Sequence, residues 1–256
     1  MDLDIDKIKA ETEKDLQRSK KILIAIFLAG LFGFGLLVWL APEVREQDKA
    51  VFKKFPMTSE DVQELSNVIM NYTEGSFGYV LAVFCFLYLL LQSFAIPGPL
   101  VLSILAGTIF GRWLGLIIVS FCATSGASMC YTLSHFFGKG IIVRKYPEKI
   151  LEANQKITEN KENLFFYLLF LRITPIVPNL IINLSSPIVG VPFKTFYFAT
   201  LFGLMPANII HINTGMTIAN IKKVGLTYDS IVFLLLLAFL ALIPTIFINR
   251  SKQKNP

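Results

Sequence analysis

The stretch "FLRITPIVPN", Phe170 to Asn179, places one arginine and two prolines inside a region that otherwise reads as a membrane span. A charge at the centre of a bilayer costs at least about 2.5 to 3.5 kcal/mol, and a proline removes a backbone donor where water cannot replace it. The stretch therefore predicts a broken helix whose polar groups face protein or a wet cavity instead of lipid.

The composition is that of an integral membrane protein. Hydrophobic residues make up 54% of the 256 residues and charged residues only 16%. The net charge of +6 comes from Lys and Arg that lie between apolar runs, a pattern that indicates membrane topology and argues against nucleic-acid binding. We therefore expect an all-α integral membrane protein, a polytopic helical bundle.

Apolar runs alternate with polar segments and define the expected organisation. We expect a cytosolic leader (1–21), a first transmembrane span (22–40), a luminal loop (41–76), a membrane domain (77–221), a last span (231–248) and a cytosolic tail (249–256). Within the membrane domain, aliphatic residues recur at helical spacing through the charged segment 139–162. That segment predicts a cytosolic amphipathic helix lying against the membrane.

Cation counts orient the chain. The leader and segment 139–162 carry six Lys or Arg each, whereas the loop at 42–76 carries four cations against seven acids. The excess of cations places segment 139–162 and both termini in the cytosol. The numbers of crossings then agree if two proline-broken segments enter and leave on one side, as re-entrant hairpins near 94–111 and 172–191.

The two broken segments resemble each other. "IPGPLVLSILAGTIFGRWLG" begins at Ile96 and "TPIVPNLIINLSSPIVGVPFK" at Thr174. Similar segments in opposite orientation predict an inverted repeat whose broken helices border a polar cleft; the alternative is a chance likeness between two kinked spans. The helix breaks are expected at Pro97, Gly98, Pro99, Pro175, Pro178, Pro187 and Gly190.

Four polar residues are candidates for a lipid-headgroup path: Arg172, Thr174, Asn179 and Asn183. A guanidinium has the geometry to bind a lipid phosphate by two hydrogen bonds. Alternatively, Arg172 lies at the cytosolic interface with its stem along lipid. The two asparagines are four residues apart on one helix face, where they either line the path or cap the broken helix.

Other motifs carry structural or targeting interpretations. Gly107 and Gly111 form G-x-x-x-G, which predicts close helix packing. Asn71 begins a glycosylation sequon close to the next span. Lys252 and Lys254 resemble a dilysine retrieval signal read by vesicle coat proteins, or else form a plain cationic anchor.

No pattern of an enzyme is found. His135 and His211 lie in apolar segments without metal-ligand spacing, and we interpret them as buried histidines with satisfied hydrogen bonds. No nucleophile–base pair and no nucleotide-binding motif is present. We therefore expect no metal, no cofactor and no enzymatic activity.

The segments "FLRITPIVPNLIINLSSPIVGVPFKTF" and "FAIPGPLVLSILAGTIFG" resemble the signature segments of the DedA/VTT superfamily, also called the SNARE-associated Golgi protein family. They are most similar to the eukaryotic transmembrane protein 41 (Stasimon) group. The resemblance implies two opposed re-entrant hairpins in an endoplasmic reticulum protein. It also implies an energy-independent phospholipid scramblase that supports autophagosome formation and lipid mobilisation, with membrane phospholipids, autophagy proteins and lipid-transfer proteins as partners.

Carboxylates are absent from the predicted membrane core. No Asp or Glu occurs between residues 75 and 147, or between 163 and 228. Proton-coupled carriers usually need an intramembrane acid, so an ion (proton)-coupled transporter is the second interpretation. A third is a non-transporting membrane-shaping scaffold that acts through the helix at 139–162.

Overall fold

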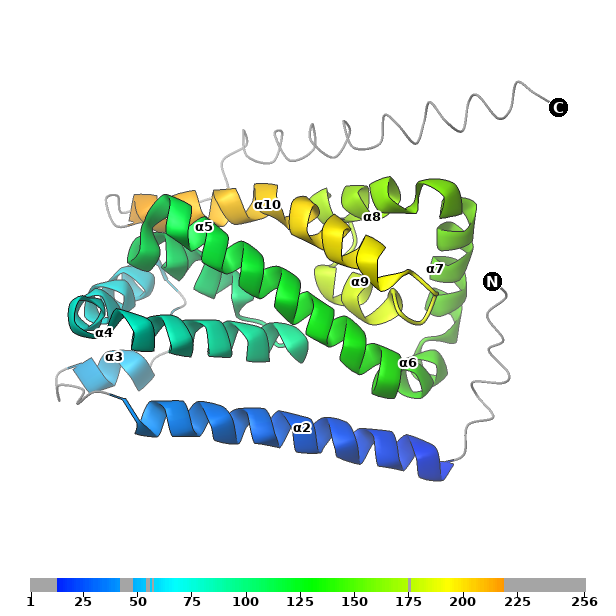
Figure 1. The fold of residues 1–256 in the computed structure, drawn as a ribbon, viewed down its shortest axis with the longest axis horizontal. Coiled ribbons are helices and arrows are strands. Elements are labelled where there is room, and N and C mark those ends of the chain that lie inside the picture. The colour runs from blue at the N-terminus through cyan, green and yellow to red at the C-terminus, as the bar shows by residue number, and fades with distance from the viewer. Residues whose placement is uncertain (1–12, 42–47, 54–55, 57, 175, 219–256) are drawn as a thin grey trace, which may run out of the picture. The chain divides into compact units, whose positions relative to one another are not determined.

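The computed structural model describes residues 13–41, 48–53, 56, 58–174 and 176–218, and all regular structure in these ranges is helical (Figure 1). The all-α prediction is therefore confirmed for this part of the chain. The elements are α2 (Glu13–Trp39), α3 (Lys49–Lys53), α4 (Ser59–Ser93), α5 (Pro99–Leu133), the π-helix η2 (Ser134–Gly138), α6 (Lys139–Lys145), α7 (Pro147–Glu159), the short 3-10 helix η3 (Lys161–Asn163), α8 (Leu164–Ile173), α9 (Asn179–Ser185) and α10 (Phe193–Ile218).

Four helical segments are long and apolar enough to cross a membrane: Asp15–Trp39, Gly75–Ser93, Pro99–Lys145 and Phe193–Thr217. The first overlaps the predicted first span, 22–40, and the other three lie almost wholly within the predicted membrane domain, 77–221. The chain is therefore a multi-pass membrane protein. The predicted last span at 231–248 and the tail lysines Lys252 and Lys254 lie outside the described residues.

The described residues of the polar segment 41–76 are largely helical, whereas we expected a loop. Thr58 caps α4: its hydroxyl accepts a hydrogen bond from the Asp61 amide at 3.2 Å, and the Asp61 carboxylate accepts one from the Thr58 amide at 3.0 Å. This reciprocal capping box stabilises the first turn. The helix then runs on to Ser93, with non-helical backbone at Ser76, where the apolar part begins.

The first predicted break is a true interruption. α4 ends at Ser93, and α5 begins at Pro99 after a short link in which Ala95 and Gly98 have positive φ angles of 60° and 148°. α5 is broken again at Gly111, whose φ of 73° lies in the left-handed region that glycine tolerates. The part of α5 from Pro99 to the break at Gly111 extends only about 18 Å at 1.5 Å per residue, which is too short for a bilayer core of about 30 Å.

The second predicted break also interrupts the helix. α8 ends at Ile173 and α9 begins at Asn179, and the turn after α9 passes through Pro187 and Gly190, whose φ is 78°. α8 has 10 residues and α9 has seven, so they extend about 15 Å and 10 Å. Neither helix is long enough to cross a bilayer. Pro175 itself lies outside the described residues.

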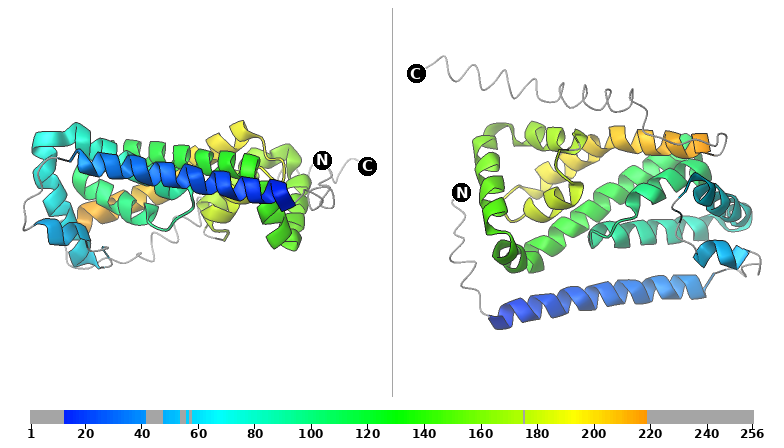
Figure 2. Two further views of the ribbon diagram at one scale, coloured as in Figure 1. Left: turned by 90° about the horizontal axis from the view of Figure 1, so that it is seen from below. Right: turned by 180° about the vertical axis from the view of Figure 1, so that it is seen from behind.

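The charged segment 139–162 forms α6, α7 and the start of η3 instead of a single helix. Pro147 is the first residue of α7, and the residue before it, Tyr146, has a non-helical φ of −135°, as expected before proline. α7 runs crosswise to α8 (Figure 1 and the right view of Figure 2). Its apolar face packs on protein, because Ile150 is buried and Ile157 contacts the same core. Leu151 of the same helix is 51% exposed, and the expectation that segment 139–162 lies against the membrane stays a prediction.

The described residues group into two compact units. Unit 1 holds residues 13–27 and those described within 127–204, and unit 2 holds the described residues of 28–126 and 205–218. Helices α2, α5 and α10 each contribute to both units. Each unit contains one of the two interruptions, at 174–178 in unit 1 and at 94–98 in unit 2.

Unit 2 depends on two close backbone contacts between α5 and α10. A Cβ atom added to Gly107 would lie 2.1 Å from the carbonyl oxygen of Ile212, and one added to Gly215 would lie 1.9 Å from that of Ile104. Only glycine allows this approach. Gly111, by contrast, has no such neighbour within 4 Å, so it provides the helix break and not the packing contact that we expected.

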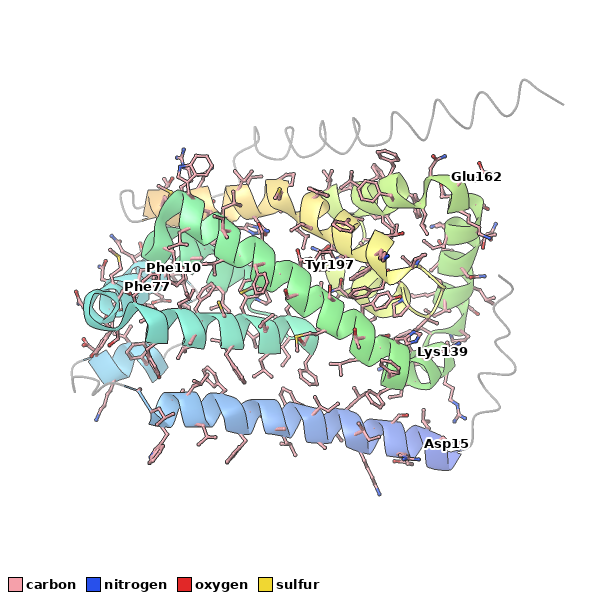
Figure 3. All side chains as sticks on the ribbon, in the orientation of Figure 1. Asp15, Phe77, Phe110, Lys139, Glu162 and Tyr197 are labelled. Carbon is pink, nitrogen blue, oxygen red and sulfur yellow. The ribbon has the colours of Figure 1, made fainter. Side chains whose placement is uncertain are left out.

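The end of the short first part of α5 is fixed by aromatic rings. Phe110 lies close to Phe77 (Figure 3), edge-on and with ring centroids 6.0 Å apart. It also lies edge-on to Phe84, with ring centroids 5.2 Å apart. Tyr88 and Ser103 share a hydrogen bond of 3.0 Å between their hydroxyls. These contacts hold the broken helix against α4.

Candidate functional site

Arg172 lies at the end of α8 and is buried, with 4% of its surface exposed. Its Nη2 donates to Asn183 Oδ1 at 2.7 Å and its Nη1 to Asn179 Oδ1 at 3.1 Å. Both asparagines belong to α9, beyond the interruption. The guanidinium thus joins the two short helices on either side of the break.

α10 provides the surface on which Arg172 rests. The guanidinium carbon lies 4.9 Å from the centre of the Phe196 ring, a cation–π contact. A Cβ on Gly203 would lie 2.4 Å from Arg172 Cβ, so the glycine leaves room for the base of the side chain. Phe196 and Gly203 are seven residues apart and therefore share a face of α10.

Hydroxyl groups from the end of α5 and from η2 satisfy carbonyls of the interrupted segment. Ser134 donates to the Leu184 carbonyl and Tyr131 to the Val191 carbonyl, each at 2.7 Å. Carbonyls near a helix end lack intrahelical partners, and leaving them unpaired away from water costs several kcal/mol. These bonds hold α9 and its following turn beside Arg172 and explain how the break is tolerated.

The site has a positive charge without a carboxylate of its own. The contacts of Arg172 within the described chain are amides and an aromatic ring, and the sequence from 163 to 228 contains no acid. A guanidinium has five N–H donors, and two are used here. Because Asn179 is exposed, a change of its rotamer would open one edge of the guanidinium to a phosphate from outside the protein.

The predicted site residues occupy different positions around the interruption after α8. Thr174 is the buried C-cap residue of α8, and its hydroxyl donates to the Phe170 carbonyl at 2.7 Å. Asn179 makes no capping bond, since Pro178 occupies the N-cap of α9. Arg172 does not lie at the surface with its stem along lipid. The structure thus brings together Arg172, Asn179 and Asn183, with Thr174 at the adjoining helix end.

Two expectations about histidine are wrong. His135 is exposed in η2, and His211 Nδ1 is buried without a hydrogen-bond partner in the described part of the chain. The sequence analysis also missed Phe196 and Gly203. Their only signal is a spacing of seven residues within an apolar helix, and this spacing is uninformative in a chain with 23 phenylalanines and 16 glycines.

Comparison with known proteins defines the class. Residues 96–217, which include the end of the first interruption, the whole of the second and Arg172, match the model of the VTT domain. Together with the apolar helices, this match makes the chain a multi-pass VTT-domain membrane protein. No solved structure gave a significant match.

Curated relatives give the particular family. Human transmembrane protein 41B is 36% identical over 235 residues, covering 91% of this chain and 80% of the relative. The transmembrane protein 41 homolog of Caenorhabditis elegans is 36% identical over 214 residues, covering 83% and 87%. Chicken (Gallus gallus) transmembrane protein 41B is 34% identical over 249 residues, covering 96% and 92%. The chain belongs to the transmembrane protein 41 family.

Proposed function

We propose that this chain is an energy-independent phospholipid scramblase. In this mechanism, Arg172 binds the phosphate of a lipid headgroup while the acyl chains stay in the hydrocarbon. The single observation that carries the proposal is a buried guanidinium held by two amides, with no carboxylate among its contacts in the described chain. A cation placed in this way is expected to have an anionic partner, and phosphate suits the geometry of arginine.

The passive character follows from the absence of acids. No Asp or Glu occurs in 75–147 or 163–228, so these segments have no carboxylate with which to bind and release a proton at membrane depth. Without an energy source, the protein lowers the barrier for headgroups and equalises the two leaflets. A proton-coupled transporter is the alternative that a transport experiment must distinguish.

The two interruptions support the proposal in a second way. We interpret them as re-entrant hairpins related as an inverted repeat, since the first part of α5 and the helices α8 and α9 are each too short to span and the two broken segments have similar sequences. Backbone groups freed by such breaks require protein or water partners. A membrane-shaping scaffold is disfavoured because the apolar face of α7 packs on the core of unit 1.

The cellular setting is proposed from the family resemblance alone. It favours the endoplasmic reticulum membrane, with both termini in the cytosol, and a role in autophagosome formation and lipid mobilisation. Autophagy and lipid-transfer proteins are the proposed partners, and no enzymatic activity is proposed.

The test is reconstitution of the purified full-length chain into liposomes that contain fluorescent phospholipids. Dithionite bleaches only the outer leaflet unless lipids exchange between leaflets. We expect bleaching to continue beyond the outer-leaflet fraction without a pH gradient. A plateau equal to that of protein-free liposomes rejects scrambling, whereas lipid movement that appears only under a pH gradient favours the proton-coupled transporter.

A further inference from the structure

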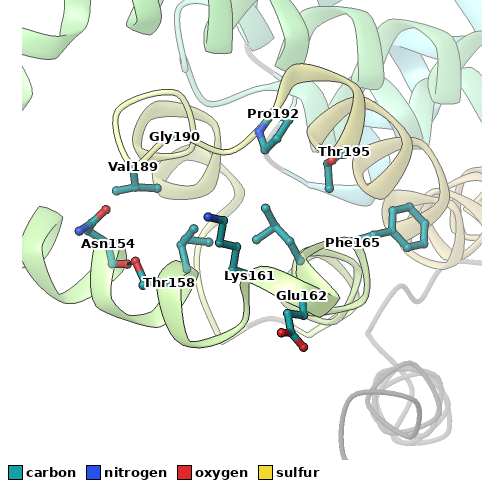
Figure 4. A pocket seen from close by; sticks show the side chains of 11 residues that line it. Asn154, Thr158, Lys161, Glu162, Phe165, Val189, Gly190, Pro192 and Thr195 are labelled. Atoms are coloured by element: carbon teal, nitrogen blue, oxygen red, sulfur yellow. Dashed lines mark hydrogen bonds between the residues drawn. The ribbon is translucent and has the colours of Figure 1, made fainter. Parts of the chain in front are cut away.

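An open pocket of about 410 Å³ lies in unit 1, apart from Arg172. It is formed by the end of α7, η3, the start of α8, the turn around Gly190 and the first turn of α10 (Figure 4). Its volume falls in the range of about 300 to 1,000 Å³ that is typical of small-ligand sites. The residues around it give it the character of an anion site with an apolar wall.

Lys161 supplies the positive charge. Figure 4 shows its side chain directed into the pocket towards Val189 and Gly190, whereas the neighbouring Glu162 points away. Within the described chain, the Lys161 ammonium makes neither a hydrogen bond nor an ion pair. Lys156 differs, because its ammonium is held by Glu152 at 2.6 Å, which raises the pKa of Lys156 and lowers that of Glu152.

Neutral polar groups complete the polar side. The Thr158 hydroxyl donates to the Asn154 carbonyl at 2.8 Å, so its oxygen remains able to accept a hydrogen bond. Thr195 lies in the first turn of α10, where backbone amides lack intrahelical partners and the helix dipole favours an anion. Apolar side chains make up the rest of the lining, and together they are called its apolar wall: Ile157, Leu164, Phe165, Val189 and Pro192.

The pocket lies beside the end of a candidate span. Thr195 is the third residue of the span Phe193–Thr217, and the rest of the lining comes from the segment between that span and the one ending at Lys145. If the span crosses the bilayer, its first turn lies at the level of the lipid headgroups. A free phosphate would use the polar side alone, whereas a lipid would use the apolar wall as well.

We propose that this pocket binds the phosphate group of an anionic glycerophospholipid, with Lys161 as its cationic contact. The apolar wall then accommodates the glycerol and the first acyl carbons. The inference does not require that the chain scrambles lipids, because it concerns a resident lipid at a fixed position.

The experiment measures binding of dioctanoyl phosphatidic acid to the purified full-length chain in detergent micelles. Inorganic phosphate is titrated in a parallel arm. Lys161→Gln is compared with Lys149→Gln, which removes a cation from the same charged segment outside the pocket. Since one lysine near a membrane surface contributes about 1 kcal/mol, we expect Lys161→Gln to weaken lipid binding about fivefold and Lys149→Gln to leave it unchanged.

Unchanged melting temperatures of both variants without lipid serve as the folding check, and Lys161 is exposed, so its replacement is tolerated. Equal lipid affinity of the wild type and Lys161→Gln would overturn the proposal. Inorganic phosphate binding as tightly as the lipid would overturn the assignment to a lipid. Absence of lipid binding by the wild type would overturn both the proposed site and its assignment to a lipid.

Discussion

Replacing Asn183 by aspartate tests whether Arg172 binds lipid or has only a structural role. Asn183 is 2% exposed, and its Oδ1 accepts the Arg172 Nη2 hydrogen bond at 2.7 Å. Aspartate has nearly the same shape, so the bond is kept while the acceptor becomes a carboxylate. Arg172 then has a counter-charge within its own protein and no longer needs one from a lipid.

The magnitude follows from the strength of the bond to phosphate. A hydrogen bond to a charged group contributes about 1.5 to 3 kcal/mol, and each 1.36 kcal/mol corresponds to a factor of ten. If scrambling depends on an Arg172–phosphate contact, Asn183→Asp should slow it about 10- to 150-fold. The melting temperature should stay the same or rise, because a bond between a cation and a carboxylate is stronger than the bond between a cation and a neutral amide.

The assay combines dithionite bleaching in liposomes with thermal unfolding in micelles. Asn163→Asp is the matched control, since it adds the same charge just before α8 without touching Arg172. Arg172→Lys, which keeps the charge but loses the two-pronged geometry, should also slow scrambling. If Asn183→Asp scrambled at the wild-type rate while folded, Arg172 would be only a structural link between α8 and α9.

Three further substitutions test the packing. Gly107→Ala should destabilise the protein by about 1 to 3 kcal/mol, because the new Cβ meets the Ile212 carbonyl. The control Gly35→Ala has no such neighbour within 4 Å and should be neutral or stabilising by up to about 1 kcal/mol. Equal melting temperatures of the two variants would refute the contact. Gly203→Ala should displace Arg172 and reduce both stability and scrambling; retention of both would show that the space is not needed. Thr58→Ala should cost about 1 kcal/mol and speed amide exchange in the first turn of α4, and unchanged exchange would argue against the capping box.

The breaks were predictable because they are local. Pro97 to Pro99 cannot continue a helix, and neither can the prolines after Arg172, so the interruptions at 94–98 and 174–178 follow from the sequence. The apolar runs likewise predict spans, since length and hydropathy decide them. The charge of Arg172 predicted a polar environment, because a charge in lipid is costly.

The partners of Arg172 were not predictable from spacing. Asn179 and Asn183 follow Arg172 by seven and 11 residues, but the helix is interrupted between Arg172 and Asn179. Helical periodicity therefore does not predict that α9 turns back to the guanidinium. Phe196 and Gly203 lie on another helix. The helix in 59–76 was missed because its residues are polar, and its start depends on one side-chain cap at Thr58.

The most direct test of the central claim is a solid-state NMR measurement of dipolar coupling between arginine side-chain nitrogens and lipid phosphorus in proteoliposomes. A charge-assisted hydrogen bond places nitrogen within about 4 Å of phosphorus. Because other arginines can also contact headgroups, the signal of interest is the difference between the wild type and Arg172→Lys. We predict a short-range coupling in the wild type that Arg172→Lys loses and Asn183→Asp weakens. Identical coupling in the wild type and Arg172→Lys would contradict the claim that Arg172 binds lipid phosphate.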